Sequence, residues 1–576
     1  MRICVLHSSY EGSGLGALEE VDDVPPQPQA FTDQHTFENK WIRKSHAIKD
    51  IKAAVAEGYD FYFNFLWGTP DDPVSGAKES RYFESLALPS CGVRSCERFM
   101  TKNDFYANAR LRGSPPVPGT ETFPLFVKPA NGCASQMIDE KSLCHDEAEL
   151  KGTLGRINKA LYENRINRAK NLGIADREAY ANSYDPESRS SDDIVVQEFI
   201  EGVDMTCTVI QMGQACLALT PFVYKTKAKA TKGNFLTFDL KHDDDTSIEL
   251  LKKKDDPALF ERIQRVAINA FMASGCRTSN MGCDVDLRVR SDGAAFAIEV
   301  NPMPAAFMPT GAFQDLPIIH SLPGGHRAVI NIFIANELQS DILINRSSLV
   351  SQVYDNMAPT YDVNAKTTEI PKVTQRIVSE FDFSGTVFDL GCGTGLFGRL
   401  LREAQSSLPP RAKSTLLGFD ISHGMLKVCE QHGAYNSVHI DTMETALINF
   451  ARYAEKVDHV VFLSSALLIS PEVFSFILVL CFTLANKSIT FTVDHITESY
   501  NRRVVENGYP HMQGTDHLKA VEAFGEPPGW RLKRGERETF WTSPNTGDLV
   551  YATCFRFERE ADASRDIMFY KEELPN

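Results

Sequence analysis

The chain has 576 residues, 43% of them apolar, and 60 basic against 76 acidic residues give it a net charge of −16. At roughly 100–200 residues per domain, three to five folding units are expected, each large enough to bury a core. Because an acidic chain repels phosphate backbones and anionic lipids, we expect no nucleic-acid partner and no membrane-surface role.

The cysteines and the apolar runs indicate a cytoplasmic protein. The 13 cysteines are scattered, with no CxxC pair and no cluster at zinc spacing, which favours reduced thiols. The apolar run at residues 1–6 is too short for a signal-peptide core. The run at 473–485 is too short for a transmembrane span of roughly 20 residues, so we interpret it as a buried helix or strand.

The predicted elements indicate an α/β fold. Short apolar runs predict strands at residues 2–6, 59–66, 123–129 and 194–200. A helical tail passes into a polar stretch near residue 345, where we place the main domain boundary. Beyond it, helix, strand, glycine turn, helix and strand alternate, which predicts a parallel sheet with crossover helices.

A predicted hairpin at residues 282–304 carries a candidate metal site. Asp286 lies on its first strand, and Glu299 and Asn301 share one face of the returning strand. The three side chains can therefore converge on one point. Their oxygens are the hard ligands that Mg²⁺ prefers, with phosphate oxygens completing the octahedron.

A second pattern, VFDLGCGTG, begins at residue 387 and predicts a nucleoside-binding turn. A strand ends in Asp389, and a glycine turn then opens a helix. Such glycines let the backbone approach a ligand and adopt positive φ. They are Gly391, Gly393 and Gly395. The next predicted strand ends in Asp420, and an acidic residue at that place suits a ribose diol.

The sequence IEVNP, which ends the hairpin, resembles the metal-binding signature of ATP-grasp carboxylate–amine ligases, in particular the D-alanine–D-alanine ligase-like group. The resemblance covers about residues 1–340. It implies an ATP-grasp fold of three subdomains, with an N-terminal subdomain over 1–100 and the ATP-grasp region over 101–345. It also implies that a carboxylate attacks the γ-phosphate of ATP and that an amine then displaces phosphate to form an amide.

The resemblance implies an ATP-binding set. Three lysines would meet the phosphates: Lys102, Lys128 and Lys241, the last at the γ-phosphate as a catalytic residue. Four hinge residues would hold the nucleoside: Gln197 and Glu198 at the adenine edge, Ile200 through its backbone N–H, and Asp204 on the ribose. Residues 131–136 would fold over the phosphates, and residues 60–69 would contribute to the acceptor site.

Two positions depart from the pattern of that family. Asp284 stands where the family has an arginine that stabilises the tetrahedral intermediate, and Arg288 on the same strand face is the candidate catalytic replacement. The segment after Asn301 resembles the eukaryotic ligase-like branch. D-alanine is therefore a poor prediction for the substrate, and a weakened ligase activity stays an open alternative.

The glycine turn, followed by GFDISHGML, resembles class I S-adenosylmethionine-dependent methyltransferases. The resemblance implies a Rossmann-like domain over residues 346–576 that binds S-adenosylmethionine through the turn. Tyr354 and Tyr361 would fold over the cofactor, and Asp441 would lie near its adenine amine. Candidate bases for methyl transfer are Asp494, His495, His511 and His517, none of them favoured.

We therefore hypothesise a bifunctional small-molecule enzyme that uses ATP, Mg²⁺ and S-adenosylmethionine. One half would join an amino acid or related carboxylate to an amine, and the other would methylate the substrate or the product. Two alternatives stay open: a methyltransferase whose ATP-grasp half only binds nucleotide or substrate, and a non-enzymatic scaffold. A homodimer is one of the assembly states that the sequence allows.

Overall fold

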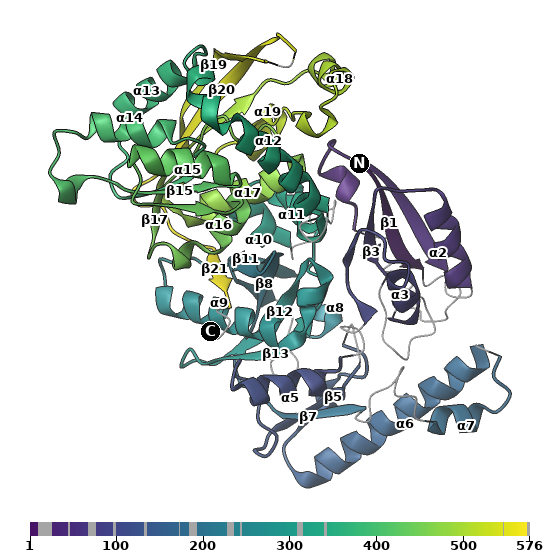
Figure 1. Cartoon of the computed structure of the whole chain (residues 1–576). Helices are drawn as coiled ribbons and strands as arrows, with labels where there is room; N and C mark the ends of the chain where they lie inside the picture. Colours follow the sequence, from purple (N-terminus) through teal and green to yellow (C-terminus); the bar gives the residue numbers. More distant parts are fainter. Residues whose placement is uncertain are drawn as a thin grey trace. The chain divides into compact units, whose positions relative to one another are not determined.

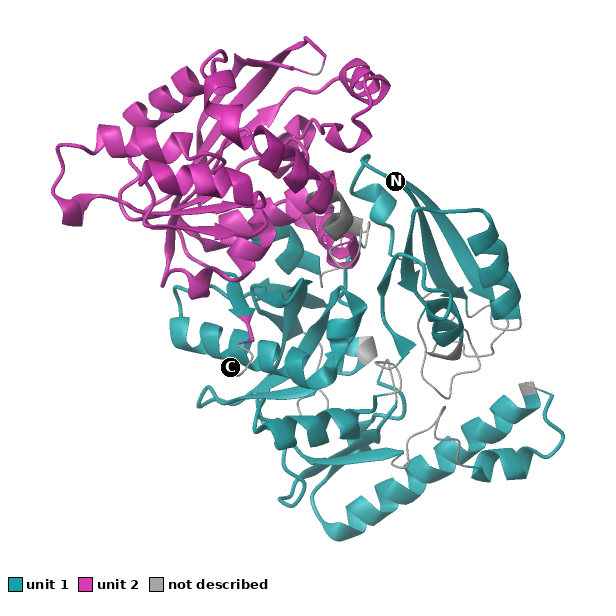
Figure 2. Cartoon of the chain, viewed as in Figure 1, with its two compact units in different colours: residues 1–321, 566–570 teal, residues 322–565, 571–576 magenta. Residues whose placement is uncertain are grey.

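The computed structural model divides into two compact units (Figures 1 and 2), residues 1–321 with 566–570 and residues 322–565 with 571–576. The residues described are 1–9, 26–43, 46–66, 77–95, 100–131, 135–171, 173–183, 193–226, 235–241, 245–307, 315–338, 342–544 and 546–572. Both units mix helices and strands, so the predicted α/β class is confirmed. The units divide between Ser321 and Leu322, whereas the domain bounds given by the sequence stay predictions.

The first unit begins with a four-stranded sheet in the order β2-β1-β3-β4, with every pair parallel. Its strands are β1 (Arg2–Ser9), β2 (Thr36–Arg43), β3 (Phe61–Phe65) and β4 (Ser90–Gly92), and its helices are α2 (Ala47–Ala56) and α3 (Ala77–Glu84). Every residue of β3 is buried, as expected for a parallel strand that is covered on both faces. The strands predicted at 2–6 and 59–66 are confirmed.

A three-stranded antiparallel sheet follows, in the order β6-β5-β7. Its elements are β5 (Leu125–Pro129), β6 (Leu143–Cys144), β7 (Ile194–Glu198), α5 (Lys102–Arg112), α6 (Glu147–Asn171) and α7 (Arg177–Asn182). A capping box starts α5, because the Asp104 N–H donates to Thr101 Oγ1 and the Thr101 N–H donates to the Asp104 carboxylate. This cap fixes Lys102 as the first residue of the helix.

The central sheet of the first unit follows the order β11-β10-β8-β12-β13, and β9 and β21 extend it beside β8. Its strands are β8 (Val203–Met212), β9 (Ala215–Ala218), β10 (Phe222–Thr226), β11 (Thr246–Leu250), β12 (Gly282–Val289), β13 (Ala295–Asn301) and β21 (Met568–Lys571). Three helices belong to this region, α8 (Phe238–Lys241), α9 (Pro257–Ser274) and α10 (Leu316–Ser321). β12 and β13 form the predicted antiparallel hairpin.

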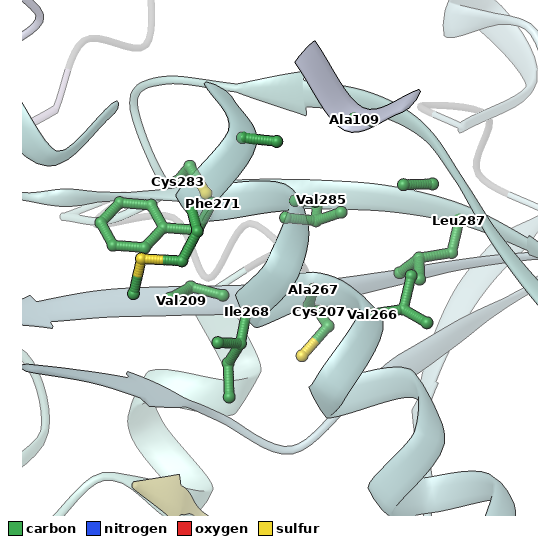
Figure 3. Packing of buried hydrophobic residues seen from close by; sticks show 14 of the residues in the cluster. Ala109, Cys207, Val209, Val266, Ala267, Ile268, Phe271, Cys283, Val285 and Leu287 are labelled. Carbon is green, nitrogen blue, oxygen red and sulfur yellow. The ribbon is translucent and has the colours of Figure 1, made fainter. Parts of the chain in front are cut away.

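The core of this region forms where α9 packs on the central sheet. Figure 3 shows side chains of α9, among them Val266 and Phe271, and side chains of the sheet, among them Val209 and Leu287, which belong to one buried cluster. Strand β21, from the far end of the chain, pairs with β9. Its Met568 and Tyr570 pack against the same core, and Gln264 Nε2 of α9 donates to the Asp566 carbonyl at 2.7 Å.

The second unit has a seven-stranded sheet in the order β16-β15-β14-β17-β18-β20-β19. Its strands are β14 (Thr386–Leu390), β15 (Thr415–Asp420), β16 (Ser437–Ile440), β17 (Val457–Phe462), β18 (Ala485–Asp494), β19 (Trp530–Thr542) and β20 (Leu549–Arg559). The first five are parallel, and β20 pairs antiparallel with both β18 and β19. The predicted parallel sheet is therefore confirmed for β14 to β18, and it continues into an antiparallel edge.

The helices of the second unit are α11 (Gly325–Leu338), α12 (Ile342–Ala365), α13 (Ile370–Glu380), α14 (Leu396–Ala404), α15 (His423–His432), α16 (Met443–Ile448), α17 (Pro471–Leu484), α18 (Glu498–Glu506) and α19 (Leu518–Phe524). The apolar run at 473–485 forms most of α17, whose residues are almost all buried. Burial on every side explains why this helix has no polar face. Within the described part of the chain, no helix is both long and apolar enough to cross a bilayer.

Candidate active sites

The hairpin of β12 and β13 brings the three predicted metal ligands together. Asp286 pairs directly with Glu299 across the two strands. Asn301 Nδ2 lies 3.5 Å from Asp286 Oδ2. A β-bulge after Asp286 leaves Ile298 without a cross-strand partner in the ladder, which frees its carbonyl to accept other hydrogen bonds. Two carboxylates and one carboxamide thus lie together, and once the amide of Asn301 turns its oxygen toward the carboxylates, this donor set fits Mg²⁺.

The three predicted phosphate-binding lysines lie against these ligands. Lys102 Nζ is 2.8 Å from Glu299 Oε1, and Lys241 Nζ is 3.3 Å from Asp286 Oδ2. Lys128 Nζ donates to the Ile298 carbonyl at 3.3 Å. The structure therefore gathers these lysines around the acidic pair, although they come from α5, β5 and α8.

The charges of this cluster oppose the effect of burial on its members. Burial alone would raise the pKa of Glu299, yet Lys102 and Lys128 lower it. Burial would lower the pKa of Lys241, yet the charge of Asp286 raises it. Burial does lower the pKa of Lys128, in spite of Glu299 and Asp286. The site is thus a set of buried charges that compensate one another, as a pocket for a metal–polyphosphate complex requires.

Arg288 holds the hinge at the other end of β12. Its Nη1 donates to both carboxylate oxygens of Asp204, at 2.9 and 3.0 Å. Its Nε donates to the Ile200 carbonyl at 2.7 Å, and its Nη2 donates to the Gly202 carbonyl at 2.8 Å. These contacts place Arg288 with the predicted ribose residue. Its catalytic role stays a prediction.

The predicted adenine edge is tied to the protein interior. Tyr106 Oη lies 2.6 Å from Gln197 Oε1 and 2.5 Å from the Ile298 carbonyl. Glu198 Oε1 accepts a hydrogen bond from the Thr122 N–H at 3.1 Å. Tyr106 was not predicted to belong to the site. Its place one helical turn after Lys102, on the same face of α5, is the sequence signal that could have found it.

An aromatic cluster adjoins the hinge. The ring of Phe126 lies 6.1 Å from that of Phe199 and 5.0 Å from that of Phe235. The Arg288 guanidinium lies 4.9 Å from the centre of the Phe199 ring. These rings give the apolar surroundings expected for adenine. The predicted phosphate loop at 131–136 and acceptor segment at 60–69 extend into residues 132–134 and 67–69, which lie outside the described residues.

Asp284 binds the polypeptide itself. Thr208 Oγ1 donates to its Oδ1 at 2.5 Å, and the Ala305 N–H donates to its Oδ2 at 2.7 Å. Burial raises the pKa of this carboxyl to about 7. In the same segment Phe307, with φ of 65°, packs against Phe65 with 6.3 Å between ring centres. Asp284 therefore fixes the segment that follows Asn301.

The second unit contains a cavity of about 570 Å³ at the carboxyl ends of its parallel strands. Most of the predicted cofactor residues line it: Tyr354, Tyr361, Asp389, Gly391, Gly393, Asp420 and Asp441. Gly395 was predicted to bind the cofactor as well, but it is not among the lining residues. None of the four candidate bases, Asp494, His495, His511 and His517, lines the cavity either.

The three glycines of the turn have different surroundings. A Cβ on Gly393 would meet no atom within 4 Å, so open space lies beside it. A Cβ on Gly391 would lie 2.5 Å from Ser465 Cβ. A Cβ on Gly395 would lie 2.7 Å from Cys429 Sγ and 3.0 Å from Tyr435 Cε2. Gly391 and Gly395 thus make room for protein side chains, and only Gly393 leaves room for a ligand.

Helix α12 is tied to α14 and to the start of α15 by the aspartates that follow its two predicted tyrosines. Asp355 Oδ1 accepts from Ser422 Oγ at 2.6 Å and from the Gly424 N–H at 2.7 Å. Asp362 Oδ2 accepts from Arg399 Nη1 at 2.9 Å. These bonds fix the helix so that Tyr354 and Tyr361 reach the cavity.

Three carboxylates of the cavity are held by neighbouring donors. Asp420 Oδ2 accepts from the Gly393 N–H at 2.9 Å. Asp441 Oδ2 accepts from Tyr453 Oη at 2.9 Å. Asp389 Oδ2 accepts from Tyr435 Oη. Burial raises the pKa of all three carboxyls, that of Asp389 to about 7. The cavity is therefore rich in carboxylates and suits a cationic ligand.

Comparison with known proteins gives a separate match for each half. Residues 172–310 match the family described as D-ala D-ala ligase C-terminus. Residues 387–481 match a methyltransferase domain family.

Curated relatives include D-alanine–D-alanine ligases from several bacteria. A D-alanine–D-alanine ligase A of Mesorhizobium japonicum is 25% identical over 170 residues, which are 29% of this chain and 44% of that protein. A D-alanine–D-alanine ligase of Herminiimonas arsenicoxydans is 32% identical over 112 residues, which are 19% of this chain and 31% of that protein. The chain thus spans less than half of the length of either relative.

Solved structures align with both halves. An L-amino acid ligase from Bacillus licheniformis covers 58% of this chain and 74% of its own, with 14% identity and a TM-score of 0.35. A magnesium protoporphyrin IX methyltransferase from Synechocystis PCC 6803 with bound SAH covers 33% of this chain and 80% of its own, with 18% identity and a TM-score of 0.25. By its family matches, this chain contains the C-terminal domain of the D-ala D-ala ligases, an ATP-grasp domain, together with a methyltransferase domain.

Proposed function

We propose that the protein is a bifunctional small-molecule enzyme. Its first half would join an amino acid or related carboxylate to an amine with ATP, and its second half would transfer a methyl group from S-adenosylmethionine to the substrate or the product. The observation that carries the proposal is that one chain contains two polar sites, the first suited to an anionic ligand and the second to a cationic ligand. Because both substrates would be small metabolites, we place the reaction in the cytoplasm.

The ligase reaction follows from the charges of the first site. The ammonium groups of Lys102, Lys128 and Lys241 would leave their present partners for the phosphate oxygens of ATP, and Lys241 would stabilise the γ-phosphoryl group as it transfers. The attacking carboxylate would form a bond to the γ-phosphorus while the bond to ADP breaks. The amine would then displace phosphate from the acyl phosphate and give the amide.

Asp286, Glu299 and Asn301 would hold Mg²⁺. When bound, this ion supplies charge neutralisation to the phosphate oxygens. Glu299 also holds Lys102, and Asp286 holds Lys241, so the same carboxylates would orient the lysines that meet the nucleotide.

The methyltransferase reaction requires a cationic cofactor held in a dry cavity. When bound, S-adenosylmethionine supplies the methyl group. Asp389, Asp420 and Asp441 offer negative charge to it, and Tyr354 and Tyr361 line the cavity from α12. The wall after β17 is largely aliphatic, with Leu463, Leu467, Leu468, Ile469 and Val473. This wall would exclude water while the methyl acceptor lies in line with the sulfonium.

A second candidate function is a methyltransferase whose ATP-grasp half binds nucleotide or substrate without ligation. Asp284 favours this alternative, because it replaces the arginine of the family pattern and has both carboxylate oxygens bound to Thr208 and Ala305. Arg288, the predicted replacement, binds Asp204.

Release of ADP separates the two candidates. The full chain would be incubated with ATP, Mg²⁺ and a panel of amino acids as carboxylate and amine donors, and ADP would be followed by a coupled assay. The bifunctional enzyme predicts ADP release that depends on a particular pair of substrates. Methyl transfer without any substrate-dependent ADP would support the second candidate instead.

A further inference from the structure

Tyr435 lies in the segment between α15 and β16, and its ring lies next to Gly395 of the glycine turn. It does not line the cavity, and its ring packs against the buried cluster of Cys392, Leu426 and Cys429. Burial and the neighbouring Asp389 raise the pKa of its hydroxyl well above the usual value. The hydroxyl therefore keeps its proton and acts as a hydrogen-bond donor.

Three glycines make the slot that holds this ring. A Cβ would lie 3.0 Å from Tyr435 Cε2 at Gly395 and 2.3 Å from the same atom at Gly398. At Gly418 it would lie 3.0 Å from Tyr435 Cδ1. Any side chain at these positions would displace the tyrosine. Part of the glycine pattern thus serves Tyr435 and not a ligand.

The hydroxyl of Tyr435 has a fixed orientation. It accepts a hydrogen bond from the Gly398 N–H at 3.1 Å and donates to Asp389 Oδ2. Since the backbone N–H can only donate, the proton of the hydroxyl is left to point at the carboxylate. Asp389 lines the cavity, so Tyr435 connects the backbone of α14 to a carboxylate of the cofactor site.

We propose that Tyr435 is a positioning residue for the methyltransferase site, which orients Asp389 and keeps it negatively charged toward the cationic cofactor. The proposal rests on the proposed binding of S-adenosylmethionine in this cavity. Tyr435 itself would not touch the cofactor.

The charges around Asp389 agree with this role. Burial raises its pKa to about 7, the Tyr435 hydroxyl opposes that rise, and the carboxylate of Asp420 on β15 adds to it. The thiols of Cys392 in the turn and Cys429 on α15 lie near the tyrosine, and the hydrogen bond between the two thiols, together with burial, raises the pKa of Cys392 well above its usual value. Without the hydroxyl, the pKa of Asp389 would rise further and the carboxylate would be protonated at a higher pH.

The test is calorimetric titration of the full chain with S-adenosylmethionine, without a methyl acceptor, for the wild type and Tyr435→Phe, between about pH 6 and pH 9. Phenylalanine keeps the ring in its slot and removes only the hydroxyl. We expect about tenfold weaker binding near pH 7, the loss of one hydrogen bond to a charged group. We also expect that, as the pH is lowered, the affinity of the variant begins to fall at a higher pH than the affinity of the wild type. Tyr500→Phe, which removes a buried hydroxyl elsewhere in the same unit, should leave the profile unchanged.

A double variant completes the test. If Tyr435 acts through Asp389, adding Tyr435→Phe to Asp389→Asn should cause no further loss of affinity. Equal pH profiles for the wild type and Tyr435→Phe, or additive losses in the double variant, would overturn the proposal. Absence of binding by the wild type would instead contradict the proposed cofactor and leave the ligase half unaffected.

Discussion

The two candidate sites differ in how their buried charges are balanced. In the first unit Glu299 pairs with Lys102 and Asp286 pairs with Lys241, so the site already contains the cations that a polyphosphate needs. In the second unit Asp389, Asp420 and Asp441 are held by a backbone N–H group and by tyrosine hydroxyls, which carry no charge. This difference indicates that the first site suits an anionic ligand with a metal ion and the second a cationic ligand.

The largest expected effect is the separate loss of each activity. Glu299→Gln removes a metal-ligand charge and the partner of Lys102, so ADP formation should fall by at least about 100-fold while S-adenosylhomocysteine binding persists. Asp389→Ala should abolish binding of that ligand and leave ADP formation intact. Coupled ADP release and calorimetry measure the two. Loss of both functions in either variant would show that the sites do not act separately.

The next effect concerns the segment after Asn301. Asp284→Ala removes both carboxylate oxygens, which accept from Thr208 Oγ1 and from the Ala305 N–H. We expect faster amide exchange over residues 302–306 and about tenfold lower kcat for ADP formation, because the loss of the bond to the Ala305 N–H misplaces the segment. Hydrogen exchange with mass spectrometry measures the first.

Thr208→Val is the matched control, since it removes one donor and leaves the Ala305 bond. Exchange in the segment should stay close to wild type in this variant. Equal exchange in Asp284→Ala and wild type would refute the assigned role of Asp284.

A smaller effect is expected at the end of the chain. Deleting residues 566–576 removes β21 from the edge of β9, together with the bond from Gln264 to the Asp566 carbonyl. We expect the transition of the first unit to move down by a few degrees, although the deleted segment follows the second unit in sequence. Differential scanning calorimetry measures it, with ATP·Mg²⁺ and S-adenosylhomocysteine used to mark the two transitions. A shift confined to the second transition would contradict the prediction.

The smallest effect is a pH dependence of stability at Asp494. Burial raises the pKa of this carboxyl to about 6, above the unfolded value of roughly 3.9. The folded state therefore holds its proton more tightly, and this contribution to stability is lost as pH rises from about 4 to 6. Asp494→Asn can still accept from Trp541 Nε1 and should raise the Tm of the second unit by about 2–4 °C at pH 8. A gain equally large near pH 4 would contradict the assigned cause.

The sequence allowed prediction where the chemistry lies within one short segment. The hairpin that carries Asp286 and Glu299 could be predicted because a two-strand turn fixes which residues face each other. The glycine turn could be predicted because its strand, turn and helix are consecutive.

The remaining parts depend on contacts between distant segments. Tyr106 reaches Gln197 and Ile298 from another element, and Tyr435 occupies a slot made by three separate glycines. Nothing in the local pattern of residues 568–571 indicates that they pair with β9. Gly395 shows the same limit, because the motif could not tell a glycine that approaches a ligand from one that makes room for a side chain.

The most direct test of the account is product mass spectrometry. The full chain would be incubated with ATP, Mg²⁺, S-adenosylmethionine bearing a labelled methyl group, and a mixture of amino acids and amines. We predict one product whose mass is that of two substrates less one water, with one labelled methyl group, formed together with ADP and S-adenosylhomocysteine. A methylated product that forms without amide and without ADP would contradict the bifunctional account.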